Sequence, residues 1–177
     1  MAVVLPRNYS QSGKSAHNSD WVKRYPTSET LPSRSSTLMN ELADARLIKL
    51  PKHMDANGDG VLVVAEVSDV PFEIQRMFTI AAPGGATRGR HAHRLCSQLM
   101  LCVTGGLDVT CDNANGRKTF SLDSPEKALL VPSGLWVEIR FKQNESVLIV
   151  LCDRVYEEGD YIRDYAEFLA FRKAARG

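Results

Sequence analysis

The feature that most restricts the fold is a succession of short apolar and β-branched runs between residues 98 and 153. The runs are Gln98–Thr104, Leu107–Cys111, Arg117–Leu122, Ala128–Val131, Trp136–Phe141 and Val147–Asp153, and turn residues such as glycine, asparagine and proline separate most of them. Runs of four to seven residues are typical of strands and too short for helices. Many short strands with no helices between them indicate an antiparallel sandwich or barrel, so we predict an all-β fold.

Further strand-like runs precede this region, and only the end of the chain has a helical pattern. The earlier runs are Leu47–Leu50, Val61–Val64 and Ile74–Ile80. After Asp160, which can cap a helix, one apolar stripe is formed by Tyr161, Ile162, Tyr165, Phe168 and Leu169. We interpret this stripe as the packing surface of a short C-terminal helix.

Length and composition bound the organisation of the chain. A chain of 177 residues suits one domain with a real core. Its first forty residues include eight serines and few large apolar residues. We therefore interpret residues 1–44 as a polar N-terminal extension, disordered in part, and residues 45–177 as the folded domain.

Charge and cysteine usage exclude several classes of partner. The 22 Lys and Arg residues nearly balance the 21 Asp and Glu residues, which gives no electrostatic basis for binding nucleic acid or an anionic membrane. No apolar run approaches the ~18 residues of a membrane-spanning helix, so we expect a soluble, cytoplasmic protein. Cys96, Cys102, Cys111 and Cys152 lie in or beside apolar runs without C-x-x-C spacing, and we predict reduced core residues.

Residues 55–66 match the spacing of a calcium-binding loop. Oxygen-bearing side chains stand at Asp55, Asn57, Asp59 and Glu66, with Gly60 at the sixth position. Such a loop needs a helix on each side, whereas prolines flank this one closely and β-branched residues lie within it. The Asn-Gly and Asp-Gly dipeptides are typical of hairpin turns, so we favour a β-hairpin without calcium.

Two histidines one residue apart, His91 and His93, stand just before the run that starts at residue 98. Strand side chains alternate, so both imidazoles and Leu95 are predicted to share one face. If that face lines a cavity, it presents two groups that exchange protons near neutral pH. Arg88 and Arg90 flank the pair and suit an anionic ligand such as a diphosphate. The stretch therefore predicts a basic, imidazole-lined cavity for a phosphorylated metabolite.

The histidine stretch resembles the first motif of the cupin family. The matching positions are Gly85, His91, His93, Gln98 and Gly105, and Pro132-Ser-Gly134 resembles the start of the second motif. Cupins would have a glutamate ligand where Gln98 stands and a third metal-binding histidine where Val137 stands. Transition metals generally take three or four protein ligands, so we predict a cupin without metal or cofactor. A metal-dependent enzyme that recruits another ligand, such as His53, is the alternative.

More specifically, the region from about Ala45 to Phe171 resembles the sugar-nucleotide 3,4-ketoisomerases of the WxcM-like cupin family. The resemblance is carried by Phe72–Arg76, Arg88–His93, Leu129–Trp136 and Tyr156–Phe168. It implies a cupin jelly-roll barrel of antiparallel strands and a homodimer whose subunits exchange strands. It also implies conversion of a dTDP-linked 4-keto-6-deoxy-hexose to its 3-keto isomer, in deoxy-aminosugar synthesis for surface polysaccharide.

Site residues follow from the resemblance and from residue chemistry. The catalytic candidates are His91 and His93, and the substrate-binding candidates are Arg76, Thr79, Arg88, Gln98 and Trp136. The two arginines are assigned to the nucleotide diphosphate. Family members carry a sugar-contacting tyrosine where this chain has Phe78-Thr79. Trp136 can stack on the base or sugar, although a strand indole is as often a core residue. A non-catalytic sugar-nucleotide sensor is a further alternative.

Overall fold

The computed structural model describes residues 45–175. The predicted extension over residues 1–44 lies outside the described residues. The elements are β1 (Arg46–Lys49), β2 (Lys52–Met54), β3 (Val61–Val63), β4 (Arg76–Ala81), β5 (Thr87–His93), β6 (Gln98–Thr104), β7 (Leu107–Asp112), β8 (Arg117–Leu122), β9 (Lys127–Val131), β10 (Trp136–Phe141), β11 (Val147–Cys152), a 3-10 turn η3 (Glu158–Asp160), β12 (Tyr161–Ile162) and α1 (Tyr165–Ala174).

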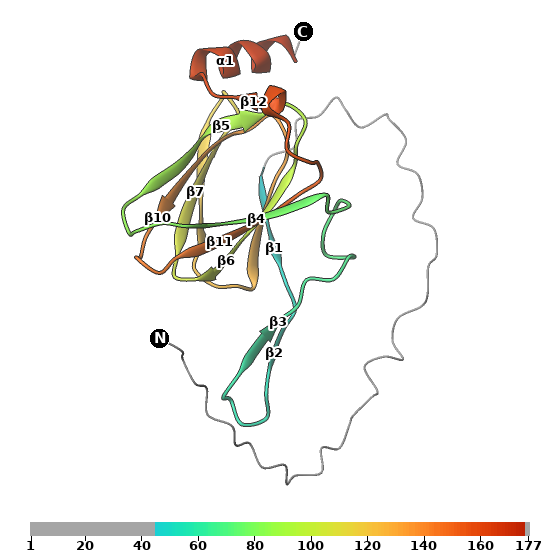
Figure 1. Ribbon diagram of the computed structural model, residues 1–177, viewed down its shortest axis with the longest axis vertical. Helices are drawn as coiled ribbons and strands as arrows, with labels where there is room; N and C mark the ends of the chain where they lie inside the picture. Colours follow the sequence, from blue (N-terminus) through green and yellow to red (C-terminus); the bar gives the residue numbers. More distant parts are fainter. Residues whose placement is uncertain (1–44, 176–177) are drawn as a thin grey trace, which may run out of the picture. The chain divides into compact units, whose positions relative to one another are not determined.

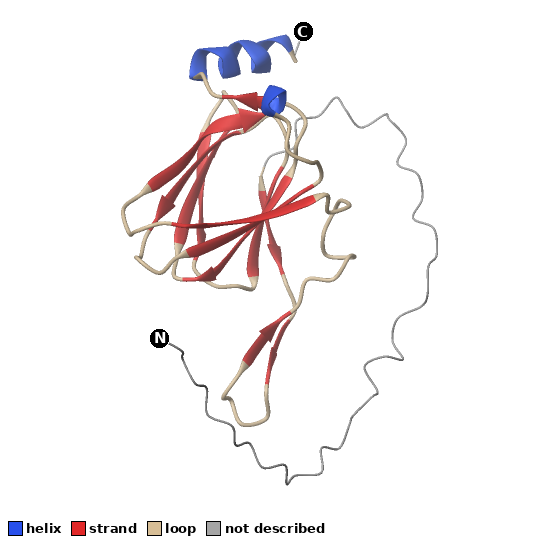
Figure 2. Cartoon of the chain, in the orientation of Figure 1, coloured by secondary structure: helices blue, strands red, loops and turns tan. Residues whose placement is uncertain are grey.

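Two five-stranded antiparallel sheets face each other (Figures 1 and 2). The first has the order β1-β9-β6-β11-β4 and the second the order β12-β5-β10-β7-β8. Apart from the β7–β8 hairpin, neighbours in both sheets come from distant parts of the chain, as in a double-sheet jelly roll. The predicted all-β, cupin-type jelly roll with a short C-terminal helix is confirmed.

The core lies between the sheets, where alternate strand residues of both sheets meet. Leu148 and Val150 of β11 face the same core as Val109 of β7 and Phe141 of β10, and each is at most 1% exposed. All four cysteines are buried there as free thiols, as predicted. The apolar runs therefore form strands because each buries one face against the opposite sheet.

The predicted hairpin over residues 55–66 is confirmed. Strands β2 and β3 pair through Lys52–Val63, His53–Leu62 and Met54–Val61, and Asp55 N–H donates to the Gly60 carbonyl. This hairpin extends away from the two sheets (Figure 1), and its strands carry exposed apolar side chains at Met54, Val61 and Leu62.

The C-terminal segment differs from the prediction in one respect. Helix α1 begins at Tyr165, and its N-cap is Asp164, whose side chain accepts the Glu167 N–H at 2.8 Å. Asp160 is therefore not the cap, because Tyr161 and Ile162 form strand β12 and pair with the end of β5.

No helix within residues 45–175 is long and apolar enough to cross a membrane.

Candidate active site

A β-bulge in β5 sets the orientation of the site residues. The register with β10 shifts just after Val137, so that Arg90 is the extra residue. Gly89 precedes it with a φ of 82°, and a Cβ there would lie 2.6 Å from the Val137 carbonyl oxygen. Only glycine fits this approach. The bulge therefore puts His91 and Arg88, which are three residues apart, on the same face of the sheet.

Both histidines line a cavity of about 130 Å³ between the sheets. The other lining residues are Phe78, Ile80, Gly89, Gln98, Met100, Val137, Ile139, Val150 and Tyr161. The shared face predicted for His91 and His93 is confirmed. Leu95, which was predicted on that face, is instead exposed, because β5 ends at His93. The cavity is thus largely apolar, with its polar groups gathered around the two imidazoles.

Asp160 holds His93 from behind the cavity. Its Oδ2 lies 2.7 Å from His93 Nδ1, and its Oδ1 accepts the Leu95 N–H at 2.7 Å. The carboxylate can only accept, so the contact assigns the proton to Nδ1. Nε2 then keeps its lone pair and accepts from the Gln98 amide at 3.3 Å. His93 is therefore oriented with its basic nitrogen away from Asp160.

Burial sets the protonation state of both imidazoles. Desolvation lowers the pKa of His91 below its ordinary value. Desolvation also lowers the pKa of His93, although the hydrogen bond to Asp160 acts in the opposite direction. Both rings are consequently neutral at physiological pH and available as proton acceptors.

Tyr161 completes the cluster around the histidines. Its ring centroid lies 5.0 Å from that of His91 and 4.3 Å from that of His93. The two imidazole centroids are 5.1 Å apart in an edge-to-face arrangement. Two groups at this separation, on one wall of one cavity, can address neighbouring atoms of a single ligand.

A second polar group sits at the start of β4. Arg76 lies opposite Cys152 of β11, and its Nη2 donates to the Cys152 Sγ at 3.5 Å. The guanidinium packs over the rings of Phe78 and Tyr156, and its buried Nε has no hydrogen-bond partner among the described residues. Arg76 therefore borders the histidine cavity and adds positive charge beside it.

The cavity wall does not supply the ligand set of a metal cupin. Beside the two imidazoles, the positions that would hold a carboxylate and a third histidine are occupied by Gln98 and Val137, and both line the cavity. His93, Cys96 and Asp160 do place potential ligand atoms within 4.8 Å of one another. Both Asp160 oxygens, however, already accept hydrogen bonds, one of them from His93 itself. The donor set therefore fits proton transfer better than metal binding within the cavity. His53, the alternative ligand, lies on the exposed β2 hairpin and does not line this cavity.

The structure brings some of the predicted substrate-binding residues to the cavity and not others. Gln98 lines it and Arg76 borders it. Arg88 is exposed, but it lies opposite Ile139, a cavity residue, and so projects from the same face of the sheet. Its role remains a prediction.

Thr79 and Trp136 were predicted at the site, and their side chains lie elsewhere. Thr79 is exposed and lies opposite Ile149, which packs on the outer face of the first sheet. Strand alternation puts Phe78 in the cavity instead. Trp136 is 6% exposed and packs beneath α1 against Phe168, because its strand position faces away from the cavity. The core interpretation of this indole is the correct one.

Asp160 and Tyr161 are site residues that the sequence analysis missed. The apolar spacing predicts Asp160 as a helix cap and Tyr161 as part of a packing stripe. The signal was available, because both stand in the segment Tyr156–Phe168, which carried much of the family resemblance. Their site roles were not predicted from periodicity, because the spacing of the apolar residues in this segment is typical of a helix.

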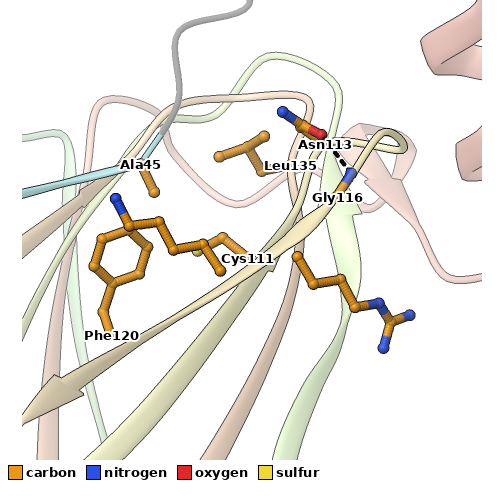
Figure 3. Close-up of a pocket in the computed structure, with 8 residues that line it drawn as sticks. Ala45, Cys111, Asn113, Gly116, Phe120 and Leu135 are labelled. Carbon is orange, nitrogen blue, oxygen red and sulfur yellow. Dashed lines mark hydrogen bonds between the residues drawn. The ribbon is translucent and has the colours of Figure 1, made fainter.

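A second cavity, of about 140 Å³, lies at the β7–β8 turn (Figure 3). Cys111, Phe120 and Leu135 line it, and Gly116 N–H donates to the Asn113 Oδ1 at its edge. It contains neither an imidazole nor a carboxylate among its lining residues. The histidine cavity is therefore the better candidate for chemistry.

Comparison with known proteins identifies the family of this chain and proteins of similar fold. Residues 43–173 match the family described as "FdtA: WxcM-like, C-terminal". The chain is 33% identical over 124 residues to the TDP-4-oxo-6-deoxy-alpha-D-glucose-3,4-oxoisomerase of Aneurinibacillus thermoaerophilus, covering 70% of this chain and 88% of that one. The fold is similar to a 3,4-ketoisomerase from Helicobacter canadensis, with 29% identity, a TM-score of 0.69 and coverage of 73% of this chain and 98% of that one. It is also similar to the sugar 3,4-ketoisomerase QdtA from Thermoanaerobacterium thermosaccharolyticum in complex with TDP, with 29% identity, a TM-score of 0.70 and coverage of 76% and 98%.

Proposed function

The chain belongs to the WxcM-like family, and from this membership and the histidine cavity we propose that it converts a TDP-linked 4-keto-6-deoxyhexose to its 3-keto isomer. The observation that carries the proposal is the pair His91 and His93 on one cavity wall, with Asp160 behind His93. Relatives that share the fold include a ketoisomerase solved with TDP and one of its variants solved with TDP-4-keto-6-deoxyglucose.

The reaction needs proton transfers between neighbouring atoms. The C3 hydrogen lies next to the C4 ketone, so its removal gives an enediolate. Protonation at C4 and movement of the hydroxyl proton from the C3 oxygen to the C4 oxygen complete the shift, and the atoms balance without an external oxidant or reductant. Each positioned acid or base supplies about 10²–10⁴-fold.

We propose different roles for the two histidines, supported by their different hydrogen-bond partners. His93 removes the C3 proton, because Asp160 fixes its tautomer and stabilises the imidazolium that forms. His91 has no carboxylate partner on its ring among the described residues, and it moves the proton between the oxygens. The centroid separation of 5.1 Å lets both rings reach one sugar. We assign no metal to the step.

The nucleotide diphosphate is held by cationic groups at the edge of the cavity. A cavity of about 130 Å³ accommodates the sugar and not the whole nucleotide sugar, so the diphosphate lies outside it. Arg88 is exposed on the cavity face of β5, and Arg76 borders the cavity from β4. Gln98 contacts the sugar from the cavity floor.

A homodimer covers the apolar side chains that remain exposed on the first sheet and on the β2–β3 hairpin. Met77 on the outer face of β4 is 62% exposed, and Leu62 on the β2–β3 hairpin is 60% exposed. A second copy that pairs with this hairpin would bury both. The support for this partner is the exposed apolar area and the family resemblance. Four free cysteines suit a reducing cytoplasm, where the product would enter deoxy-aminosugar synthesis for surface polysaccharide.

The decisive experiment compares His91→Asn and His93→Asn with the parent enzyme. The protein is incubated in deuterated buffer with TDP-4-keto-6-deoxyglucose, and the sugar protons are followed by NMR. We expect both variants to bind the nucleotide sugar and to lose about two or more orders of magnitude in isomerisation.

The exchange pattern separates the two roles. His93→Asn should not exchange deuterium into C3, whereas His91→Asn should still exchange at C3 without completing the shift. Parent-like turnover by both variants would reject the proton-transfer role. Binding without turnover by the parent itself would identify a sugar-nucleotide sensor.

A further inference from the structure

Two of the four buried thiols lie together directly behind the histidine cavity. Cys152 ends β11, and Cys96 lies in the turn between β5 and β6. That turn is tied to the end of β11, because Ser97 N–H donates to the Asp153 Oδ1 at 3.0 Å and Asp153 N–H donates to the Ser97 carbonyl at 3.2 Å. The Cys96 Sγ donates to the Ser97 carbonyl oxygen at 3.5 Å, and these backbone ties place the Cys96 turn beside Cys152, which lies opposite Gln98.

The surroundings of Cys152 favour its thiolate. Arg76 Nη2 lies 3.5 Å and Gln98 Nε2 lies 3.8 Å from its sulfur, so two donors converge on an atom that is fully buried. The neighbouring Cys96 thiol and the Arg76 guanidinium lower the pKa of Cys152 below that of an ordinary thiol. The thiolate is the nucleophilic form of cysteine.

The other two cysteines provide an internal comparison. Burial raises the pKa of Cys111 to about 12, and burial also raises that of Cys102. Neither has a cationic side chain or a second thiol among its hydrogen-bond partners in the described residues. All four thiols are at most 5% exposed, so solvent exposure alone predicts no selectivity among them.

We propose that Cys96 and Cys152 form an oxidation site that hydrogen peroxide converts to a disulfide, and that this disulfide slows the isomerase reaction. The second part rests on the proposed function. The first part rests only on the placement of the two sulfurs and the guanidinium.

The chemistry balances with peroxide as the oxidant. The Cys152 thiolate attacks one peroxide oxygen, the O–O bond breaks, and hydroxide leaves to give a sulfenic acid. The Cys96 sulfur then attacks the Cys152 sulfur, an S–S bond forms, and water leaves. The thiol proton of Cys152 converts the hydroxide to a second water. Two thiols thus lose two electrons, and peroxide gains them.

The contacts of Gln98 explain why the disulfide reaches the catalytic site. Gln98 contacts Cys152 through the same amide nitrogen that lies 3.3 Å from His93 Nε2. Arg76, which also contacts Cys152, borders the cavity. A disulfide removes the anionic partner of both donors and draws the sulfur towards Cys96. The polar end of the cavity is therefore rearranged.

The test treats the fully reduced, full-length protein with hydrogen peroxide, blocks the remaining thiols with N-ethylmaleimide, and measures intact and peptide masses. We expect a species that lacks two hydrogens, a mapped Cys96–Cys152 bond, and alkylation of Cys102 and Cys111 only. Cys96→Ser and Cys152→Ser should each abolish the bond, whereas the matched controls Cys102→Ser and Cys111→Ser should keep it. Arg76→Gln should slow its formation by roughly tenfold, since the cation favours the thiolate.

Three results would overturn the proposal. The first is a disulfide that includes Cys102 or Cys111, and the second is the absence of any disulfide. The third is an oxidised enzyme with the isomerisation rate of the reduced one, because this result would show that the disulfide does not slow isomerisation. We expect at least a tenfold lower rate after oxidation, with recovery in dithiothreitol. If the reduced enzyme were inactive, the proposed function would be rejected. The mass measurement would still show whether the Cys96–Cys152 disulfide forms.

Discussion

Replacing Asp160 by asparagine tests whether the carboxylate behind His93 is a positioning group. The His93–Asp160 contact is 2.7 Å long, and each side chain is only 6% exposed. Asparagine has nearly the same shape, and its amide oxygen can still accept the Leu95 N–H that Asp160 Oδ1 accepts now. Its NH₂ group would then face His93 Nδ1 and donate to it. The proton of the neutral ring would move to Nε2, and the nitrogen that takes the substrate proton would be blocked.

The size of the effect follows from losing both the tautomer and the charge. The variant cannot stabilise the imidazolium through an ionised partner, so we expect isomerisation to fall about 10²–10⁴-fold, as for carboxylate-to-amide changes behind catalytic histidines. This loss corresponds to about 3–5 kcal/mol of transition-state stabilisation. Substrate binding and the folded structure should be retained.

The pH dependence distinguishes a positioning role from a structural one. Burial lowers the pKa of His93, and Asp160 partly opposes that shift. The base must be neutral to act, so the parent's activity should be present near neutral pH and should be lost as the pH falls through this lowered pKa. Without the carboxylate the pKa falls further, and the acid limb should move to lower pH. A purely structural effect would reduce the isomerisation rate without moving the acid limb of the pH profile.

Asp153→Asn is the matched control. Asp153 accepts a backbone N–H in the same region but has no contact with a histidine among the described residues. Its rate should stay within about twofold of the parent, the size of a typical neutral substitution. If Asp160→Asn kept more than a tenth of the parental rate with an unchanged pH profile, the assigned role of the carboxylate would be wrong.

Two other predictions concern the fold and the assembly. Gly89→Ala should lower the free energy of unfolding by about 1–3 kcal/mol in denaturant titrations, because the φ of 82° and the 2.6 Å approach to the Val137 carbonyl oxygen oppose a Cβ. The control is Gly116→Ala, whose Cβ would meet nothing within 4 Å and which should change the free energy of unfolding much less. Sedimentation should give a dimer at micromolar concentration and a shift towards monomer for Met77→Glu on the outer face, whereas a monomeric parent would contradict the proposed dimer.

The strands and the histidine pair were predictable because their signals are local. The run Gln98–Thr104 becomes β6 with the predicted bounds, since a short, largely apolar run that ends at a two-glycine turn leaves few other solutions. His91 and His93 share a face for the same reason. The family was also recognisable from the sequence, because its motifs combine fixed spacings with unusual residues.

Contacts between distant segments were not predictable in this way. His93 and Asp160 stand 67 positions apart, and their pairing depends on β12 joining the edge of β5. The helical pattern of residues 161–169 concealed that short strand. Likewise, Thr79 was the predicted substrate contact, and only the register with β11 showed that Phe78 lines the cavity instead.

The sequence by itself therefore determined most of the strands, the turns, the shared face of the histidine pair and the family, because each depends on alternation or spacing within a few residues. Only the tertiary structure decided which side of each strand faces the cavity, that Trp136 belongs to the core beneath α1, and that Cys96, Cys152 and Arg76 meet behind the histidines. The physical reason is that the register between strands and the bulge at Gly89–Arg90 are set by packing of the whole sheet. A shift of one residue reverses the face of every side chain in a strand.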